Sequence, residues 1–381
     1  MTRRIRGGRS ITGGPSRKHF LALLRHSTLG KLANLARCET ERLTGKLTLA
    51  SQPYILKLEL ANACNLRCPG CPTGLRMPGR AKRTVDPEMV RSLIGEIGRN
   101  LYIAHLYNWG EPMLHPRASE IVRMIAEANV YTSMSSHLSL HDFDRIESIC
   151  RAGLSHLIVS IDGITQESYA RYRKGGDLNL VLSNLKRLVR LRSVRSDVRT
   201  TIEWQMLSLR SSEAELDAAF ALAREIGVDW FRTRAPIAPA AEQPTDAARR
   251  GHHHGHGAAC AMPWRYLAVQ SDGAVSACCN TFFPEDDFGG LRSGSVRHLK
   301  NSARFEQARR LATRRGWVGS DIDPGHPCLR CPVLHRSPMA PEILSRFPEA
   351  QCETGFMAVL DRQRLKYGLA WGEAEPPFGS Q

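Results

Sequence analysis

The chain has 381 residues, of which 42% are hydrophobic and 24% are charged. This composition is that of a soluble globular protein, which excludes overall disorder, and the length suits two domains. The formal net charge of +16 would suit a polyanionic partner, but the basic residues are not confined to one stripe, so charge alone does not predict nucleic-acid binding.

Residues 1–52 form a basic extension, with eleven Lys or Arg against two acids. We expect its first part to be disordered. The apolar pattern from about residue 16 to 42 predicts one or two short amphipathic helices that cover one end or the flank of the following domain, or alternatively lie on a membrane surface. The longest apolar run, 20–24, is too short for a secretion signal or a membrane span.

Residues 53–235 alternate short apolar runs with amphipathic stretches, which indicates a parallel βα array. The expected strands are Ile55–Leu60, Tyr102–Trp109, Tyr131–Ser135, His156–Ile161, Arg199–Met206 and Asp229–Arg232. The expected helices lie near residues 86–98, 116–128, 142–152, 178–193 and 212–226. Six such strands make three quarters of a TIM barrel, so the predicted fold class is α/β, a partial (β/α)6 TIM barrel. In that fold the chemistry lies at the C-terminal ends of the strands.

Three cysteines, Cys64, Cys68 and Cys71, follow the first expected strand in one short loop. As thiolates they are soft ligands for zinc or for an iron–sulfur cluster. Three ligands on a [4Fe-4S] cluster leave one iron open to an external chelating ligand. The alternative is a zinc site that takes its fourth ligand from Cys38 or from a histidine.

Polar and turn-forming residues follow the other expected strands. A carboxylate beside backbone carbonyls can receive a cation, and a guanidinium can pair with a carboxylate through two hydrogen bonds. The plainer alternatives are a simple turn after the second strand and an exposed arginine in a basic helix. Gly110, Glu111 and Pro112 follow the second expected strand, and Ser135 closes the third. Ser160 and Asp162 lie at the end of the fourth, Arg173 follows them, and Gln205 is on the fifth.

The second half of the chain begins with a Pro-, Gly- and His-rich stretch, residues 236–258, which we interpret as a linker rather than a histidine metal site. Residues 259–335 then carry a hairpin signal, 266–270 and 274–278 around a Ser-Asp-Gly turn. Four cysteines from such a hairpin and a CxxC knuckle can ligate one iron–sulfur cluster, or alternatively one zinc ion. In the tail, 336–381, we expect one helix around 355–365 and assign no function.

The CxxxCxxC loop after the first strand resembles that of the radical S-adenosylmethionine (SAM) enzymes, and the cysteines of 259–335 resemble the SPASM/twitch extension of that superfamily. Trp109-Gly110-Glu111-Pro112 is similar to the Gly-Gly-Glu motif, with Trp at the first position, and Ser160-Ile161-Asp162-Gly163 to a Ser-Asp-Gly strand end. The resemblance implies that SAM binds the open iron of the Cys64/Cys68/Cys71 cluster. It also implies the candidate cofactor-binding residues, which are Gly110, Glu111, Pro112, Ser135, Ser160, Asp162, Arg173 and Gln205. Because the seven-cysteine SPASM pattern is incomplete, we expect one auxiliary [4Fe-4S] cluster in a small α+β domain, held by Cys260, Cys278, Cys328 and Cys331, with Cys279 as a substitute for Cys278.

The resemblance further implies reductive cleavage of SAM to a 5'-deoxyadenosyl radical, which abstracts hydrogen from a substrate C–H bond. We expect oxidation of a small polar or carbohydrate-like substrate, with the auxiliary cluster as electron acceptor and a donor such as flavodoxin or ferredoxin. The alternatives are peptide maturation, methylation, or epimerisation using Cys150, Cys279 or Cys352. The non-enzyme alternative is a zinc-stapled nucleic-acid-binding protein. With its cysteines grouped as metal ligands, the protein is expected in the reducing cytoplasm.

Overall fold

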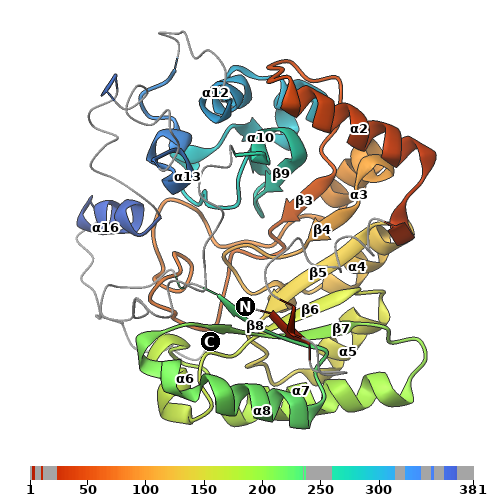
Figure 1. Cartoon of the computed structure of the whole chain (residues 1–381), viewed down its shortest axis with the longest axis vertical. Helices are drawn as coiled ribbons and strands as arrows, with labels where there is room; N and C mark the ends of the chain where they lie inside the picture. Colours follow the sequence, from red (N-terminus) through yellow and green to blue (C-terminus); the bar gives the residue numbers. More distant parts are fainter. Residues whose placement is uncertain are drawn as a thin grey trace.

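The computed structural model describes residues 2–4, 10–11, 24–234, 236, 260–313, 322–335, 345–346 and 356–366. The predicted linker, apart from Pro236, and Cys352 lie outside these residues. Strands form one continuous curved sheet through the centre of the molecule, with helices along its outer side (Figure 1). Within the described residues, none of the helices combines the length and apolar character needed to cross a bilayer.

The six parallel strands predicted for the barrel are present, and they pair in chain order without closing into a ring. They are β3 (Ile55–Leu58), β4 (Ile103–His105), β5 (Tyr131–Ser136), β6 (His156–Ser160), β7 (Thr201–Leu207) and β8 (Trp230–Arg234). The predicted partial barrel is therefore confirmed. The second strand is shorter than expected, because the chain leaves the ladder after His105 to build a loop.

All five predicted barrel helices are confirmed, and the structure adds a sixth, α6. The helices are α3 (Pro87–Ile97), α4 (Ala118–Glu127), α5 (Phe143–Arg151), α6 (Gln166–Tyr172), α7 (Leu178–Val194) and α8 (Leu216–Ile226). Helix α3 begins where the Asp86 carboxylate accepts from the Glu88 amide, with Pro87 at the first position, as is favourable for a helix start. Helix α8 ends at Gly227, whose φ of +89° suits glycine.

The two faces of the strands differ in polarity. Outward residues such as Leu56, Leu58 and Trp204 are fully buried in the main core beneath the helices. Inward positions carry polar side chains, among them Lys57, His156 and Glu203, because successive strand residues point to opposite faces. The inner face of the barrel sheet is therefore polar and carries charged residues.

The N-terminal helix α2 (Leu29–Leu43) covers the end of the barrel opposite the cysteine loop. Cys38 packs with Tyr54, Tyr102 and Trp264, which lie at the N-terminal ends of the strands or beside them. This is one of the two placements expected for the helix. The first part of the extension was expected to be disordered, whereas β1 (Thr2–Arg4) pairs antiparallel with β8 and with β2 (Ser10–Ile11). The open edge of β8 offers unpaired backbone groups for this pairing.

The C-terminal part extends the same sheet on its other edge. Strand β9 (Tyr266–Val269) pairs parallel with β3, and the predicted hairpin continues through β10 (Ala274–Ser276) to β11 (Gly289–Gly290). Among the described residues, the remaining helices are α10 (Met262–Arg265), α11 (Val296–Lys300), α12 (Ala303–Ala312), α13 (Pro332–His335) and α16 (Phe356–Lys366). The 3-10 turns of the same residues are η1 (Gly98–Asn100), η2 (Pro112–Leu114), η3 (Arg210–Glu215), η6 (Pro284–Asp286), η7 (Leu291–Ser293) and η8 (Pro327–Arg330). Helix α16 confirms the helix predicted in the tail.

Candidate functional site: two cysteine centres joined by one sheet

The three-cysteine loop lies at the C-terminal end of β3, where the barrel fold places chemistry. Cys64, Cys68 and Cys71 pack together with Leu66 and Tyr172. Burial raises the pKa of all three thiols, that of Cys71 to about 12. In the absence of a metal the thiols therefore hold their protons, and a cluster that binds here must displace them.

Backbone contacts fix the path of this loop. The Arg67 amide donates to the Lys174 carbonyl at 2.9 Å, and Asn65 Nδ2 donates to the Ser139 carbonyl at 3.0 Å. Gly74 lies so close that a Cβ atom there would be 2.7 Å from the Cys68 amide nitrogen. The loop is thus pre-shaped by its neighbours, and the three thiols suit three corners of a cluster.

The predicted Gly110-Glu111-Pro112 motif lies beside this loop. A Cβ atom on Gly110 would be 1.8 Å from the Ala61 carbonyl oxygen, so only glycine fits. The Glu111 carboxylate is buried, and it accepts from the amides of Met113 at 3.1 Å and His137 at 3.2 Å. Burial raises the pKa of Glu111 to about 7. Pro112 begins the turn η2, so the motif both turns the chain and presents a carboxylate near the thiols.

Asp162 and Arg173 form an ion pair at the same end of the barrel. Arg173 Nε donates to Asp162 Oδ2 at 2.5 Å, and the Leu207 amide donates to Asp162 Oδ1 at 2.7 Å. Arg173 Nη1 lies 3.8 Å from the sulfur of Cys68. Burial opposes the charge on Arg173, but Asp162 and Cys68 raise its pKa well above the usual value. Arg173 is therefore not the exposed arginine of the plainer alternative.

The other predicted contacts come from neighbouring inward positions. The hydroxyls of Ser135 and Ser160 lie 3.3 Å apart, and Gln205 is the register partner of Ser160 across the β6–β7 ladder. The structure thus brings all the predicted cofactor-binding residues of the barrel to the C-terminal ends of its strands. Two further predicted thiols do not join them: Cys150 is buried in the outer helix α5, and Cys352 lies outside the described residues.

A second centre lies between the hairpin and the C-terminal knuckle. One cavity of about 110 Å³ is lined by all four predicted ligands, Cys260, Cys278, Cys328 and Cys331, and Cys279 is absent from its lining. His326 shapes the knuckle, since its Nδ1 accepts from the Cys328 amide at 3.2 Å. Burial raises the pKa of Cys260 to about 11. The four thiols fit a four-cysteine cluster, and the lining favours Cys278 over Cys279.

Trp109 connects the two centres. Its carbonyl oxygen lies 3.1 Å from the sulfur of Cys71, and its indole Nε1 donates to the Thr281 carbonyl at 2.9 Å. Thr281 Oγ1 in turn donates to the Cys278 carbonyl at 3.1 Å. The sequence departs from Gly-Gly-Glu at this position, and the structure gives the indole a contact that glycine could not make.

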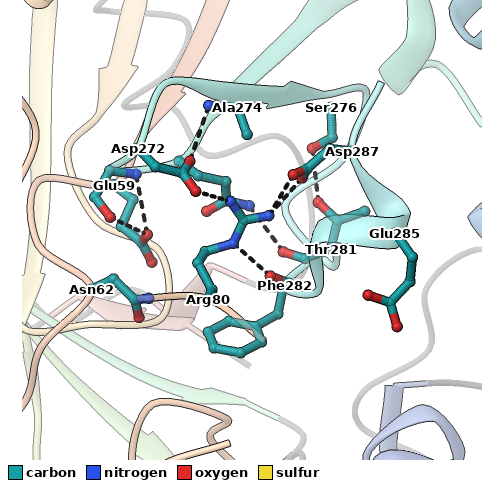
Figure 2. Close-up of polar contacts among 12 residues, drawn as sticks. Glu59, Asn62, Arg80, Asp272, Ala274, Ser276, Thr281, Phe282, Glu285 and Asp287 are labelled. Atoms are coloured by element: carbon teal, nitrogen blue, oxygen red, sulfur yellow. Dashed lines mark hydrogen bonds and ion pairs between the residues drawn. The ribbon is translucent and has the colours of Figure 1, made fainter. Parts of the chain in front are cut away.

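Arg80 provides a second connection between the same two parts. Figure 2 shows its guanidinium between Asp272 and Asp287 of the hairpin region, with the Phe282 carbonyl accepting from Nε at 2.7 Å. The side chain is 1% exposed. Sequence reasoning missed Arg80, because nothing in its neighbourhood marks it among the chain's many arginines.

Lys57 was also missed, although the signal was present. It alternates with leucines in β3, and such alternation in an otherwise apolar strand indicates an inward charge. Its Nζ lies 3.5 Å from the centre of the Tyr107 ring. The interior between the two centres is therefore lined by a buried cation and a phenol.

Comparisons with known protein families agree with this arrangement. The Radical SAM superfamily matches residues 58–202, and SPASM, an iron–sulfur cluster-binding domain, matches residues 260–332. These matches span the two cysteine centres, and they favour iron–sulfur clusters over the zinc alternatives. They also support an enzyme rather than a nucleic-acid-binding protein.

Curated relatives resemble about half of the chain. A PqqA peptide cyclase of Gluconobacter oxydans is 27% identical over 183 residues, 48% of this chain and 49% of the relative. An AdoMet-dependent heme synthase of Methanosarcina barkeri is 26% identical over 190 residues, 48% and 50% of the two chains. This chain thus spans about half the length of these relatives.

Among solved structures, Streptococcus suis SuiB bound to S-adenosylmethionine shares the fold, with a TM-score of 0.57 and 11% identity. The similarity covers 74% of this chain and 73% of SuiB. Three observations agree: the cysteine loop at the end of β3, the Radical SAM match over the barrel, and the SPASM match over the hairpin and the C-terminal cysteines. We conclude that the chain is an enzyme of the radical SAM superfamily with a C-terminal SPASM domain.

Proposed function

We propose that this enzyme abstracts hydrogen from a C–H bond of a polar substrate held inside the barrel, and that the net reaction is an oxidation. The main support is the arrangement of the two centres: three thiols at the end of β3, and four thiols around one cavity, joined through Trp109. When bound, the first cluster and SAM supply a 5'-deoxyadenosyl radical by reductive cleavage, and the second cluster can accept the electron that remains on the product.

The chain's own residues would bind and orient the SAM molecule. Cys64, Cys68 and Cys71 would hold the cluster. The buried Glu111 carboxylate would receive the SAM ammonium group, and Arg173, oriented by Asp162, would face the SAM carboxylate. Ser135, Ser160 and Gln205 would line the path of SAM along the inner wall. A flavodoxin or ferredoxin would deliver the electron.

The substrate class has two candidates. A small polar or carbohydrate-like molecule fits the polar interior formed by Lys57, His156 and Glu203. The similarity to a PqqA peptide cyclase favours a peptide substrate as the second candidate. Both candidates require the same radical step. They differ in size, because a peptide substrate would have to place several residues inside the barrel.

The first test is the iron and sulfide content of anaerobically reconstituted protein, with electron paramagnetic resonance before and after SAM is added. We expect about eight irons in the wild type and about four in a variant in which Cys64, Cys68 and Cys71 are all alanine. A SAM-dependent spectral change should appear only in the wild type. Zinc without iron, or no response to SAM, would overturn the proposal.

A further inference from the structure

Lys57 is a buried cation that faces the barrel interior. The side chains before and after it, Leu56 and Leu58, point outward into the core, and Lys57 itself is only 8% exposed. Its ammonium group lies over the Tyr107 ring, and it donates to no hydrogen-bond acceptor among the residues that the structure describes. The thiols of Cys279 and Cys278 and the Glu59 carboxylate lie within electrostatic range of this ammonium, but none of them accepts a hydrogen bond from it among the described residues. A buried ammonium without a direct polar partner is costly, so this position calls for an anion.

Two arginines, Arg232 and Arg234, alternate along β8 in register with Gln205 and Leu207 of β7, so they share the inward face of the sheet. The Tyr107 side chain lies within electrostatic range of the Cys279 thiol, of Glu203 from β7, and of both arginines. Lys57 and these arginines therefore surround Tyr107 from both ends of the row of barrel strands. Positive charge gathers at the inner wall between the two cysteine centres.

The nearby carboxylates are already engaged by other groups. Glu203 Oε1 lies 3.1 Å from Arg232 Nε, and Glu203 Oε2 lies 3.2 Å from His156 Nε2. Glu59, the other acid near Lys57, accepts from the Trp109 amide at 3.2 Å and from the Ser271 hydroxyl at 3.1 Å. Within the described ranges, neither Lys57 nor Arg234 has a carboxylate within ion-pair distance.

We propose that Lys57 and Arg234 bind an anionic group of the substrate, a carboxylate or a phosphate, beside Tyr107. An ammonium and a guanidinium both form strong charge-assisted hydrogen bonds to such oxygens. This inference rests on the proposed function, since it gives that reaction an acidic substrate. The anion would hold the substrate against β3 and β8, at the inner wall between the two cysteine centres.

The test uses reconstituted holoenzyme with saturating SAM and small probes, followed by NMR line broadening. The probes are succinate, its uncharged counterpart succinamide, and inorganic phosphate. We expect succinate or phosphate, but not succinamide, to be broadened by the wild type. The variants Lys57→Gln and Arg234→Gln should each weaken the apparent affinity about tenfold or more, as expected for the loss of a charge-assisted hydrogen bond.

A matched control removes two positive charges from the outer surface. In the double variant Arg99→Gln/Lys186→Gln both positions are exposed, and the probe affinity should be unchanged. Lys57→Arg keeps the charge and should retain binding, and iron content checks that each variant is folded. If Lys57→Gln does not fold, the probe affinity of Arg234→Gln decides the question, because Arg234 is exposed and its replacement should not prevent folding.

Three results would overturn the inference: equal broadening by succinamide, unchanged affinity in both the Lys57→Gln and the Arg234→Gln variant, or an equal loss of affinity in the surface control. Formation of 5'-deoxyadenosine by the wild type is measured in parallel. Cleavage of SAM without an anion preference would remove only this inference. Absence of SAM cleavage would instead remove the proposed reaction, whatever the probes show.

Discussion

Arg80 Nη2 lies 2.7 Å from both carboxylate oxygens of Asp287, a residue 207 positions further along the chain. Arg80 belongs to the segment that follows the cysteine loop, and Asp287 follows the turn η6 beside the second centre. The same guanidinium also contacts Asp272 in the turn of the hairpin. One buried side chain therefore fixes the cysteine loop of the barrel against the auxiliary domain.

Replacing Arg80 with methionine should be strongly destabilising. The variant leaves the Asp287 and Asp272 carboxylates without their cation, and breaking such a buried pair costs about 3–5 kcal/mol. Anaerobic chemical denaturation of the holoprotein would measure the free energy of unfolding. The control is Arg91→Met, which breaks the exposed ion pairs of Arg91 with Glu88 and Glu120 and should cost about 1 kcal/mol or less. Equal losses in the two variants would mean that the buried Arg80 contacts add no more stability than exposed ion pairs.

Gly110→Ala should disturb the SAM motif, because its Cβ would collide with the Ala61 carbonyl, a backbone atom that cannot rotate away. We expect a loss of about 2 kcal/mol or more in unfolding free energy and weaker SAM binding by calorimetry. Gly95→Ala is the matched control. It lies within α3 with no atom within 4 Å of the added Cβ, so it should stabilise the protein by about 0.5–1 kcal/mol. A Gly110→Ala variant that binds SAM normally would contradict the assigned close approach.

Cys278→Ala and Cys279→Ala should differ in iron content. Cys278 lines the cavity of the second centre and its neighbour does not, so only the first substitution should remove about four irons. Iron and sulfide analysis of the two reconstituted variants measures the difference. Loss of iron from the Cys279 variant alone would reverse the assignment of the ligand.

Lys31 should make stability depend on pH in the alkaline range. Burial lowers the pKa of Lys31 to about 8 in the folded protein, whereas the unfolded chain keeps the ordinary value near 10.5. Between these values the unfolded state binds more protons, so Lys31 makes the folded state more stable as pH rises from about 8 to 10.5. The Lys31→Met variant should lack this gain. The free energy of unfolding of both proteins is measured by chemical denaturation at pH 8 and at pH 10. If it changes equally in the two proteins between these pH values, Lys31 does not titrate as described.

The sequence was sufficient to predict the barrel and its first centre, because both depend on local pattern. Alternating apolar runs and amphipathic stretches locate β3 to β8, and Cys64, Cys68 and Cys71 are adjacent in sequence. The short helix α6 was missed, since seven residues cover too few turns to show a clear period.

Contacts between distant segments could not be predicted. Arg80 and Asp287 meet only because β9 pairs with β3, and a single sequence gives no sign of that pairing. Trp109 looked like a departure from a motif, and its contact with Thr281 is visible only when both segments are in place. The residues that join the two centres were therefore the ones least accessible to sequence reasoning.

The β3–β9 ladder has a mechanical consequence. Four register pairs, from Ile55↔Tyr266 to Leu58↔Val269, make the auxiliary domain an extension of the barrel sheet. A fragment that ends before Cys260 would leave the whole edge of β3 without a partner, and such an edge promotes aggregation. The two parts should consequently unfold in a single transition, and the spacing between the centres is set by a rigid ladder rather than by a hinge.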